Sequence, residues 1–125
     1  MFSVESLRSE ANIQEIVTKE WTDCKNFQPD WEWFNLYNGS KEAIGHASVK
    51  REGLTIVFQC FALEPLSNQP ELRDFFFKGV LGAMSMRGAF FLQAAENCSF
   101  LMKEFHFESN TEIEGLLKGS CRHEA

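Results

Sequence analysis

The sequence predicts an α+β fold in which a mixed central sheet is flanked by helices. Two turn signals separate three β-rich runs, a strand and a helix precede these runs, and a helix–strand–helix succession follows them. The predicted order is therefore β-α-β-β-β-α-β-α-β, with one more strand allowed at the end. The strand–helix–strand unit in the middle implies a parallel pair joined by a right-handed crossover.

The first two elements are a strand and a helix. "FSVESL" alternates as a strand does, and Ser9 is the predicted N-cap of the helix "EANIQEIVTKEW". Apolar residues recur in this helix at helical spacing, from Ile13 to Trp21. Pro29, in the polar stretch that follows, argues against a continued helix.

Three antiparallel strands are predicted next, because Asn38-Gly39 and Arg51-Glu52-Gly53 are turn signals between β-rich runs. The strands span residues 32–37, 42–50 and 54–63. The last one is apolar on both faces, which is typical of a central strand.

The second half of the chain begins with a long helix. Pro65 and Pro70 introduce "ELRDFFFKGVLGAMSMRG", and Gly88 ends it. "AFFLQAA" is predicted to be a short buried strand, and "CSFLMKEF" a two-turn helix. "HFES" and "EIEGLLKGS" are predicted as the last strands.

Composition indicates one domain, 1–125, because 125 residues with 44% hydrophobic content suffice for a single core. The net charge of −6 and the pI near 5.0 argue against nucleic acid and anionic membrane as partners. No segment approaches the roughly 18 apolar residues of a membrane span, and the N-terminus lacks signal-peptide features. We therefore expect a cytoplasmic protein.

The cysteines and histidines form no metal-ligand pattern. There is no CxxC pair, and the histidines share no ligand-like spacing with one another or with the cysteines. Two of the cysteines lie among apolar residues and are predicted to belong to the core. The residues concerned are Cys24, Cys121, His46, His106, His123 and the predicted core pair, Cys60 and Cys98.

Four segments, taken in order, resemble motifs of the GNAT superfamily of N-acyltransferases, which use acyl-CoA to acylate amines. "NGSKEAIGHASV" resembles the family's second hairpin, and "LTIVFQCFALEP" its fourth strand with a V-x-P-like end. "RGAFFLQAAEN" resembles its fifth strand and the Asn that follows, and "FLMKEFHF" its closing A-L-Y-x-K-x-G-F motif. The resemblance covers nearly the whole chain and rests on order and spacing. It implies acetyl-CoA or another acyl-CoA as cofactor, a small amine as substrate, and a homodimer.

The resemblance implies a cofactor site around "PLSNQPELRD". The family's pyrophosphate loop, x-x-R/Q-x-x-G-x-G/A, fits this stretch without a gap when counted from Pro65 or from Gly88. Its Arg/Gln falls on Asn68, and its two glycines fall on Glu71 and Arg73. The implied cofactor-binding residues are Phe61, Ala62 and Leu63, through their backbone, and Asn68, Gln69, Glu71, Leu72, Arg73 and Asn97.

The chemistry of this loop departs from the family. Residues 68–71 have the N-x-x-E form of a capping box, with Asn68 as N-cap and Glu71 reaching back, and Pro70 removes one donor. Glu71 also places a negative charge where the pyrophosphate would lie. Like charges at about 4 Å and an effective dielectric near 20 cost on the order of 4 kcal/mol. An ordinary capped helix start is therefore the preferred interpretation.

Catalytic residues are only partly retained. Glu64 is the implied general base, although a solvated carboxylate before a turn is the preferred interpretation of this residue. The family's Tyr, the acid that protonates the thiolate, falls on Met102, which cannot donate a proton. The motif's Gly falls on His106, which is either a substitute acid or a structural residue. Asn97 is either a cofactor contact or a plain N-cap.

The acceptor region is short, because "DCKNFQPDWEWF" stands where the family usually has two helices. Trp31, Trp33 and Phe34 either line a small apolar pocket or belong to the core or to a dimer contact.

Two functions stay open. One is an acyl-CoA-dependent N-acyltransferase with a degenerate cofactor loop. The other is a catalytically inactive GNAT-like domain that acts as a small-ligand-binding or dimerisation module. An unrelated ferredoxin-like binding domain would be indicated if the fourth and fifth strands paired without splaying apart.

Overall fold

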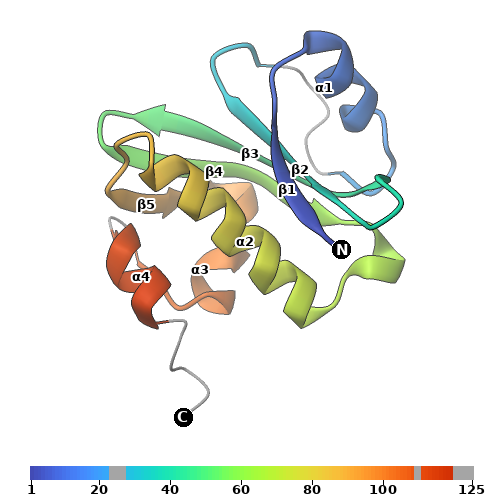
Figure 1. Cartoon of the computed structure of the whole chain (residues 1–125). Coiled ribbons are helices and arrows are strands. Elements are labelled where there is room, and N and C mark those ends of the chain that lie inside the picture. Colours follow the sequence, from blue (N-terminus) through green and yellow to red (C-terminus); the bar gives the residue numbers. More distant parts are fainter. Residues whose placement is uncertain (23–27, 109–110, 120–125) are drawn as a thin grey trace.

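The computed structural model describes residues 1–22, 28–108 and 111–119. They form a six-stranded sheet whose spatial order, β1-β2-β3-β4-β5-β6, is also the chain order (Figure 1). The strands are β1 (Ser3–Leu7), β2 (Glu32–Tyr37), β3 (Ala43–Glu52), β4 (Thr55–Leu63), β5 (Phe91–Ala94) and β6 (Thr111–Glu112). The α-helices are α1 (Glu10–Val17), α2 (Pro70–Ser85), α3 (Phe100–Glu104) and α4 (Ile113–Gly119), and short 3-10 helices span Pro65–Ser67 and Glu96–Cys98.

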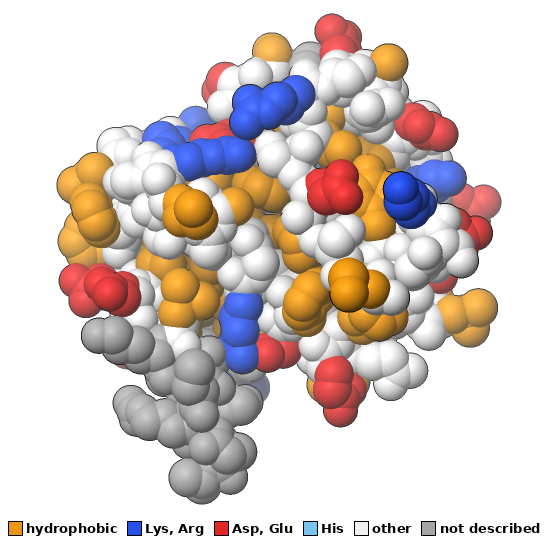
Figure 2. All heavy atoms as spheres, viewed as in Figure 1, with side chains coloured by type: hydrophobic (Ala, Val, Ile, Leu, Met, Phe, Trp, Pro, Cys, Tyr) orange, Lys and Arg blue, Asp and Glu red, His pale blue; other side chains and the backbone are white. Residues whose placement is uncertain are grey.

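The predicted α+β class and the predicted order of elements are confirmed as far as β6. Neighbouring strands run antiparallel throughout, except β4 and β5, which are parallel as the crossover through α2 requires. Figure 2 shows charged side chains of both signs over one face of the molecule, with apolar side chains between them. Within the described part of the chain, no helix combines the length and the apolar character needed to cross a membrane.

The parallel pairing of β4 with β5 is short. It runs only from the pair Thr55–Phe91 to the pair Phe58–Ala94, whereas β4 continues to Leu63 on its β3 side. The ladder stops there because β5 itself ends at Ala94, so beyond Phe58 this edge of β4 has no partner strand among the described residues.

Helix α1 begins as predicted. The Ser9 hydroxyl accepts a hydrogen bond from the backbone N of Asn12 at 3.4 Å, which is the geometry of an N-cap. The helix buries Ile13, Ile16 and Val17 against Trp33 and Cys60 on one face of the sheet. It ends after Val17, earlier than the predicted Trp21.

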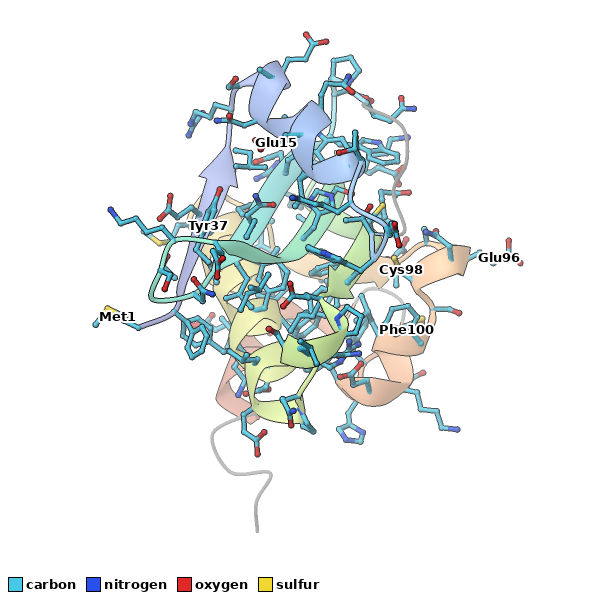
Figure 3. The ribbon with its side chains drawn as sticks, turned by 90° about the vertical axis from the view of Figure 1, so that its right-hand side faces the viewer. Met1, Glu15, Tyr37, Glu96, Cys98 and Phe100 are labelled. Atoms are coloured by element: carbon cyan, nitrogen blue, oxygen red, sulfur yellow. The ribbon has the colours of Figure 1, made fainter. Side chains whose placement is uncertain are left out.

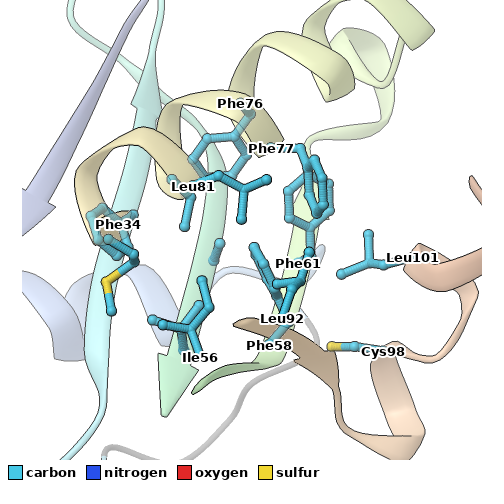
Figure 4. Packing of buried hydrophobic residues seen from close by; sticks show 14 of the residues in the cluster. Phe34, Ile56, Phe58, Phe61, Phe76, Phe77, Leu81, Leu92, Cys98 and Leu101 are labelled. Atoms are coloured by element: carbon cyan, nitrogen blue, oxygen red, sulfur yellow. The ribbon is translucent and has the colours of Figure 1, made fainter. Parts of the chain in front are cut away.

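The larger core lies on the other face, between the sheet and α2. Phe76 and Phe77 are fully buried and stack on Phe61 and Phe58, with ring centroids 5.2 and 5.3 Å apart (Figure 4). Helix α2 ends at Ser85, and Gly88, with φ of +87°, turns the chain toward β5. The predicted positions of this helix and its stop are thus confirmed within a few residues.

The prediction of strands at "HFES" and "EIEGLLKGS" is wrong. His106 to Glu108 form no strand, and after the two residues of β6 the chain turns into helix α4. The reason is the apolar spacing, because Ile113, Leu116 and Leu117 recur at i, i+3 and i+4 and pack on the core as a helical face does.

A close contact between β1 and α2 gives a stability test. A Cβ atom at Gly79 would lie 2.6 Å from Cγ2 of Val4, whereas a Cβ at Gly82 of the same helix meets nothing within 4 Å. We expect Gly79→Ala to lower the free energy of unfolding by about 1–3 kcal/mol through overpacking. Gly82→Ala should raise it by about 0.5–1 kcal/mol through helix propensity. Urea unfolding of both variants measures this, and equal effects at the two sites would contradict the packing account.

Candidate functional site

The end of β4 presents backbone groups to an open edge. The backbone N of Glu64 donates to Ile44 O of β3 at 2.8 Å. Because strand peptide groups alternate in direction, those of Leu63 and Phe61 face the opposite edge. That edge lies beyond the last residue that pairs with β5. This is the place where the resemblance puts the pantetheine arm of the cofactor.

Beyond the end of β5, the segment that leads into α3 lies against this edge of β4. The carboxamide of Asn97 donates to Gln59 O at 2.7 Å. Gln59 directly follows Phe58, the last residue of β4 that pairs with β5. Phe105, which follows α3, stacks on Phe77 with ring centroids 3.9 Å apart and the ring planes 3° from parallel. Asn97 therefore links this segment to the edge of β4 and is not the N-cap of α3, which is Ser99.

The predicted capping box at the start of α2 is wrong. Gln69 is the N-cap, and it makes no side-chain capping bond. Asn68 is instead the residue that ends the 3-10 turn after β4, where its N–H donates to Pro65 O at 3.3 Å. Its side-chain oxygen accepts from Nη1 of Arg73 at 2.8 Å. Glu71 is exposed, so its carboxylate adds charge at this helix start without capping it.

Arg73 holds α2 and α3 together. Its Nε and Nη2 atoms each donate to the carboxylate of Glu104 at 2.6 Å, a bidentate pair between the first turn of α2 and the last residue of α3. The guanidinium also lies over the rings of Phe61 and Phe100, 5.3 and 5.8 Å from their centroids. Leu72, next to it, is partly buried against the core. The position of the family's second glycine is thus occupied by a clamp.

A groove of about 910 Å³ opens beside this clamp, between α2, the end of α3, and α4. Its floor includes Phe105 and Leu116, and four carboxylates border it: Glu71, Asp74, Glu104 and Glu112. Two of the four are paired with cations, Asp74 with Lys78 and Glu104 with Arg73. The groove is acidic at the point where a pyrophosphate would need positive potential.

A second pocket, of about 470 Å³, opens on the opposite face between α1 and the sheet. Glu64 lines it, and its carboxylate accepts a hydrogen bond from the Ser67 hydroxyl at 3.2 Å. Figure 3 shows two other lining residues, Glu15 on α1 and Tyr37 at the end of β2. Glu64 thus lies where the end of β4 meets a polar pocket.

The position that the resemblance assigns to the closing motif's Gly has a backbone conformation that favours glycine, although its residue is His106. His106 has φ of +57°, which lies in the left-handed region. Its exposed side chain lines the acidic groove. Met102 is partly buried against the core and supplies no proton donor. Tyr37 belongs to the other pocket, so it does not replace the family's Tyr here.

Other predicted residues are structural. Cys60, Cys98, Trp33 and Phe34 are buried in the two cores, so the core interpretation of these residues is confirmed. Among the described residues, no group of three or more His, Cys, Asp or Glu could hold a metal ion. Three of the residues considered for metal binding, Cys24, Cys121 and His123, lie outside the described residues.

Sequence reasoning missed a buried polar row on the α1 side of the sheet. Asn35 and His46 are buried, and Ser48 lies two residues further along β3. Alternation places Asn35 and Tyr37 on the face of Trp33, and the strand register sets Asn35 opposite His46. The period-two pattern was visible in each strand, whereas the pairing between the strands was not.

The structure has the fold of the GNAT acyltransferases. It is similar to the ribosomal-protein-S18-alanine N-acetyltransferase of Escherichia coli, with a TM-score of 0.63 and 13% identity over 85% of this chain and 75% of that one. It is also similar to Tetrahymena GCN5, with a TM-score of 0.61 and 12% identity over 82% and 77% of the two chains. The N-acetylglutamate synthase of Neisseria gonorrhoeae, complexed with coenzyme A and N-acetyl-glutamate, aligns at a TM-score of 0.56 and 12% identity, over 75% of this chain and 25% of that one. The sequence matches no family model and no curated protein, so this similarity is one of fold.

The clamp between α2 and α3 gives a second test. The Arg73 side chain is only 16% exposed and its pair with Glu104 is bidentate, so a double-mutant cycle of Arg73→Met and Glu104→Gln should show about 1–2 kcal/mol of coupling. The matched control is the more exposed pair Lys78–Asp74 on α2, for which about 0.3–0.5 kcal/mol is expected. Chemical unfolding of each variant measures both couplings. A coupling for Arg73–Glu104 no larger than the control would contradict the clamp.

Proposed function

We propose that the protein is an acyl-CoA-dependent N-acyltransferase of the GNAT type with a degenerate cofactor loop. It takes acetyl-CoA or another acyl-CoA and a small amine. The observation that carries the proposal is the end of β4, where an unpaired backbone edge and a carboxylate-lined pocket meet on one strand. The GNAT fold of the structural neighbours supports it.

The residues of this site fit the pantetheine arm of an acyl-CoA better than its pyrophosphate. The peptide groups of Phe61 and Leu63 can pair with the amides of a pantetheine arm, and this needs no particular side chain. At the start of α2, the N–H groups of Glu71 and Leu72 have no side-chain cap and are available to a phosphate. The carboxylate of Glu71 opposes that phosphate, so we expect weak nucleotide binding.

Glu64 is the proposed general base. A bound acyl-CoA supplies an activated acyl group at the end of β4. Glu64 accepts a proton from the ammonium group of the amine, directly or through one water, so that the nitrogen lone pair is free to attack. The hydroxyl of Ser67 fixes the carboxylate in place. Among the described residues that border the groove, His106 is the candidate proton donor to the departing thiolate.

A second candidate is a catalytically inactive GNAT-like domain that acts as a small-ligand-binding or dimerisation module. One specific observation favours it. The end of α3 is held to α2 by the Phe77–Phe105 stack and by the Arg73–Glu104 pair, and a cofactor that enters between these helices would have to displace both contacts. Under this alternative the pocket beside Glu64 retains a ligand, and no acyl transfer takes place.

Calorimetry with acetyl-CoA separates the two candidates. The enzyme proposal expects saturable binding at millimolar cofactor or below, whereas absence of binding at that concentration supports the inactive domain. Glu71→Gln should tighten binding by about threefold to tenfold, because it removes a like charge that is partly screened by solvent. Glu10→Gln on α1, on the other face of the sheet, makes the same charge change and should leave the affinity unaltered.

Acyl transfer tests the role of Glu64. Thiol release from acetyl-CoA, followed with a panel of small amines, should fall by about 100-fold or more in Glu64→Gln, because the proton acceptor is lost. The affinity for acetyl-CoA should stay the same. Glu5→Gln on the exposed face of β1 serves as the control. A rate unchanged in Glu64→Gln would remove this residue from the mechanism.

A further inference from the structure

A chain of hydrogen bonds leads from the buried interior of the sheet to the pocket under α1. His46 has no exposed surface, and its Nδ1 lies 3.3 Å from Oδ1 of Asn35. The Nδ2 atom of Asn35, which is 4% exposed, donates to the hydroxyl of Tyr37 at 3.2 Å. Asn35 and Tyr37 both line the pocket. The chain therefore connects a fully buried imidazole to a ligand-sized space.

The direction of this chain follows from its chemistry. The amide oxygen of Asn35 can only accept, so Nδ1 of His46 carries the proton, and Nε2 holds a lone pair that has no partner among the described residues. The opposite amide orientation would leave a buried N–H without an acceptor, which native structures avoid more strictly than an unused lone pair. Trp33, with its ring 5.4 Å from the imidazole, fixes the ring plane.

Tyr37 is the outer end of the chain. Its hydroxyl oxygen already accepts from Asn35, so its own proton is left to donate. Hydrogen bonds aligned in one direction polarise one another, which strengthens the terminal donor. Lys41, at the same end of β2, also lines the pocket and adds positive charge. The carboxylate of Glu42, next to Lys41, also lines the pocket and accepts a hydrogen bond from Nδ2 of Asn38 at 2.9 Å. Tyr37 and Lys41 therefore offer a ligand carboxylate one hydrogen-bond donor and one cation.

Besides Lys19 and Lys41, three carboxylates line the pocket, those of Glu15, Glu42 and Glu64. Glu64 is the one at the end of β4. Its carboxylate is partly buried and has a hydroxyl donor in Ser67, and among the described residues it has no cationic partner. A positively charged ligand group would supply the missing partner. The pocket volume of about 470 Å³ is large enough for a single amino acid but small for a folded partner segment.

We infer that this pocket binds a zwitterionic amine of the α-amino-acid class. Its ammonium faces Glu64, and its carboxylate faces the hydroxyl of Tyr37 and the ammonium of Lys41. The inference deepens the proposed function by naming the class of acceptor. It rests on that function only for the ligand's role as acyl acceptor, because the binding site itself needs no cofactor.

Ligand-observed NMR and calorimetry on the full chain, without cofactor, test the inference. Three matched pairs compare an amino acid with its decarboxylated amine: L-phenylalanine with phenethylamine, L-lysine with cadaverine, and L-leucine with isopentylamine. At least one amino acid should bind about tenfold or more tightly than its amine partner, since a charged hydrogen-bond acceptor is lost. If no amino acid binds, or if the amines bind equally well, the inference is overturned.

Two variants locate the carboxylate. Tyr37→Phe removes only the hydroxyl and should weaken the amino acid about tenfold while leaving the affinity of the amine unchanged. Lys41→Gln should weaken the amino acid severalfold, and Lys103→Gln on α3 is the matched control with no expected effect. Thermal unfolding confirms that each variant is folded. Equal losses for amino acid and amine in Tyr37→Phe would contradict the inference.

The outcomes separate this inference from the proposed function. If the protein binds an amino acid but no acetyl-CoA, the inferred amino-acid pocket is supported and the proposed enzymatic function is refuted. If it binds acetyl-CoA and acylates amines with no preference for those that carry a carboxylate, the proposed function is supported and the inferred amino-acid specificity is refuted.

Discussion

The early end of the parallel pairing between β4 and β5 is the constraint on which the rest of the structure depends. After Phe58, β4 has a partner strand on one side only, so five of its residues need another cover. Aromatic rings from α2 and from the segment after α3 supply it, and this accounts for a large share of the phenylalanine content of the chain. Asn97 satisfies the first carbonyl left without a ladder partner.

The alternation of side chains along β4 places apolar and polar residues on opposite faces of the sheet. Phe61 and Leu63 point to the apolar core under α2, whereas Cys60 packs in the small core under α1 and Glu64 lines the pocket beside it. One strand therefore separates an aromatic, acid-bordered side from a polar pocket that contains both signs of charge. The two proposed binding events lie on opposite faces of the sheet and meet only at its end.

Sequence reasoning reached as far as local patterns allow. Ser9, the hairpins and the core face of α2 were predictable because cap chemistry, turn residues and apolar spacing are properties of neighbouring residues. The capping box was mispredicted because Asn68 closes the preceding turn, a competition between two local structures that share one residue. The Arg73–Glu104 pair joins residues 31 positions apart, and the pairing of Asn35 with His46 depends on strand register. Neither can be derived without the fold.

The seam between α2 and the segment after α3 has a thermodynamic consequence for any molecule that enters there. The ion pair and the Phe77–Phe105 stack both join α2 to the end of α3, so they are expected to open together. A ligand that needs the open form has its apparent affinity reduced by the fraction of molecules that are open. Binding between α2 and the segment after α3 thus depends on the equilibrium between the closed and open forms of the protein. A substitution that shifts this equilibrium changes the apparent affinity for the ligand even if the substituted residue does not contact the ligand.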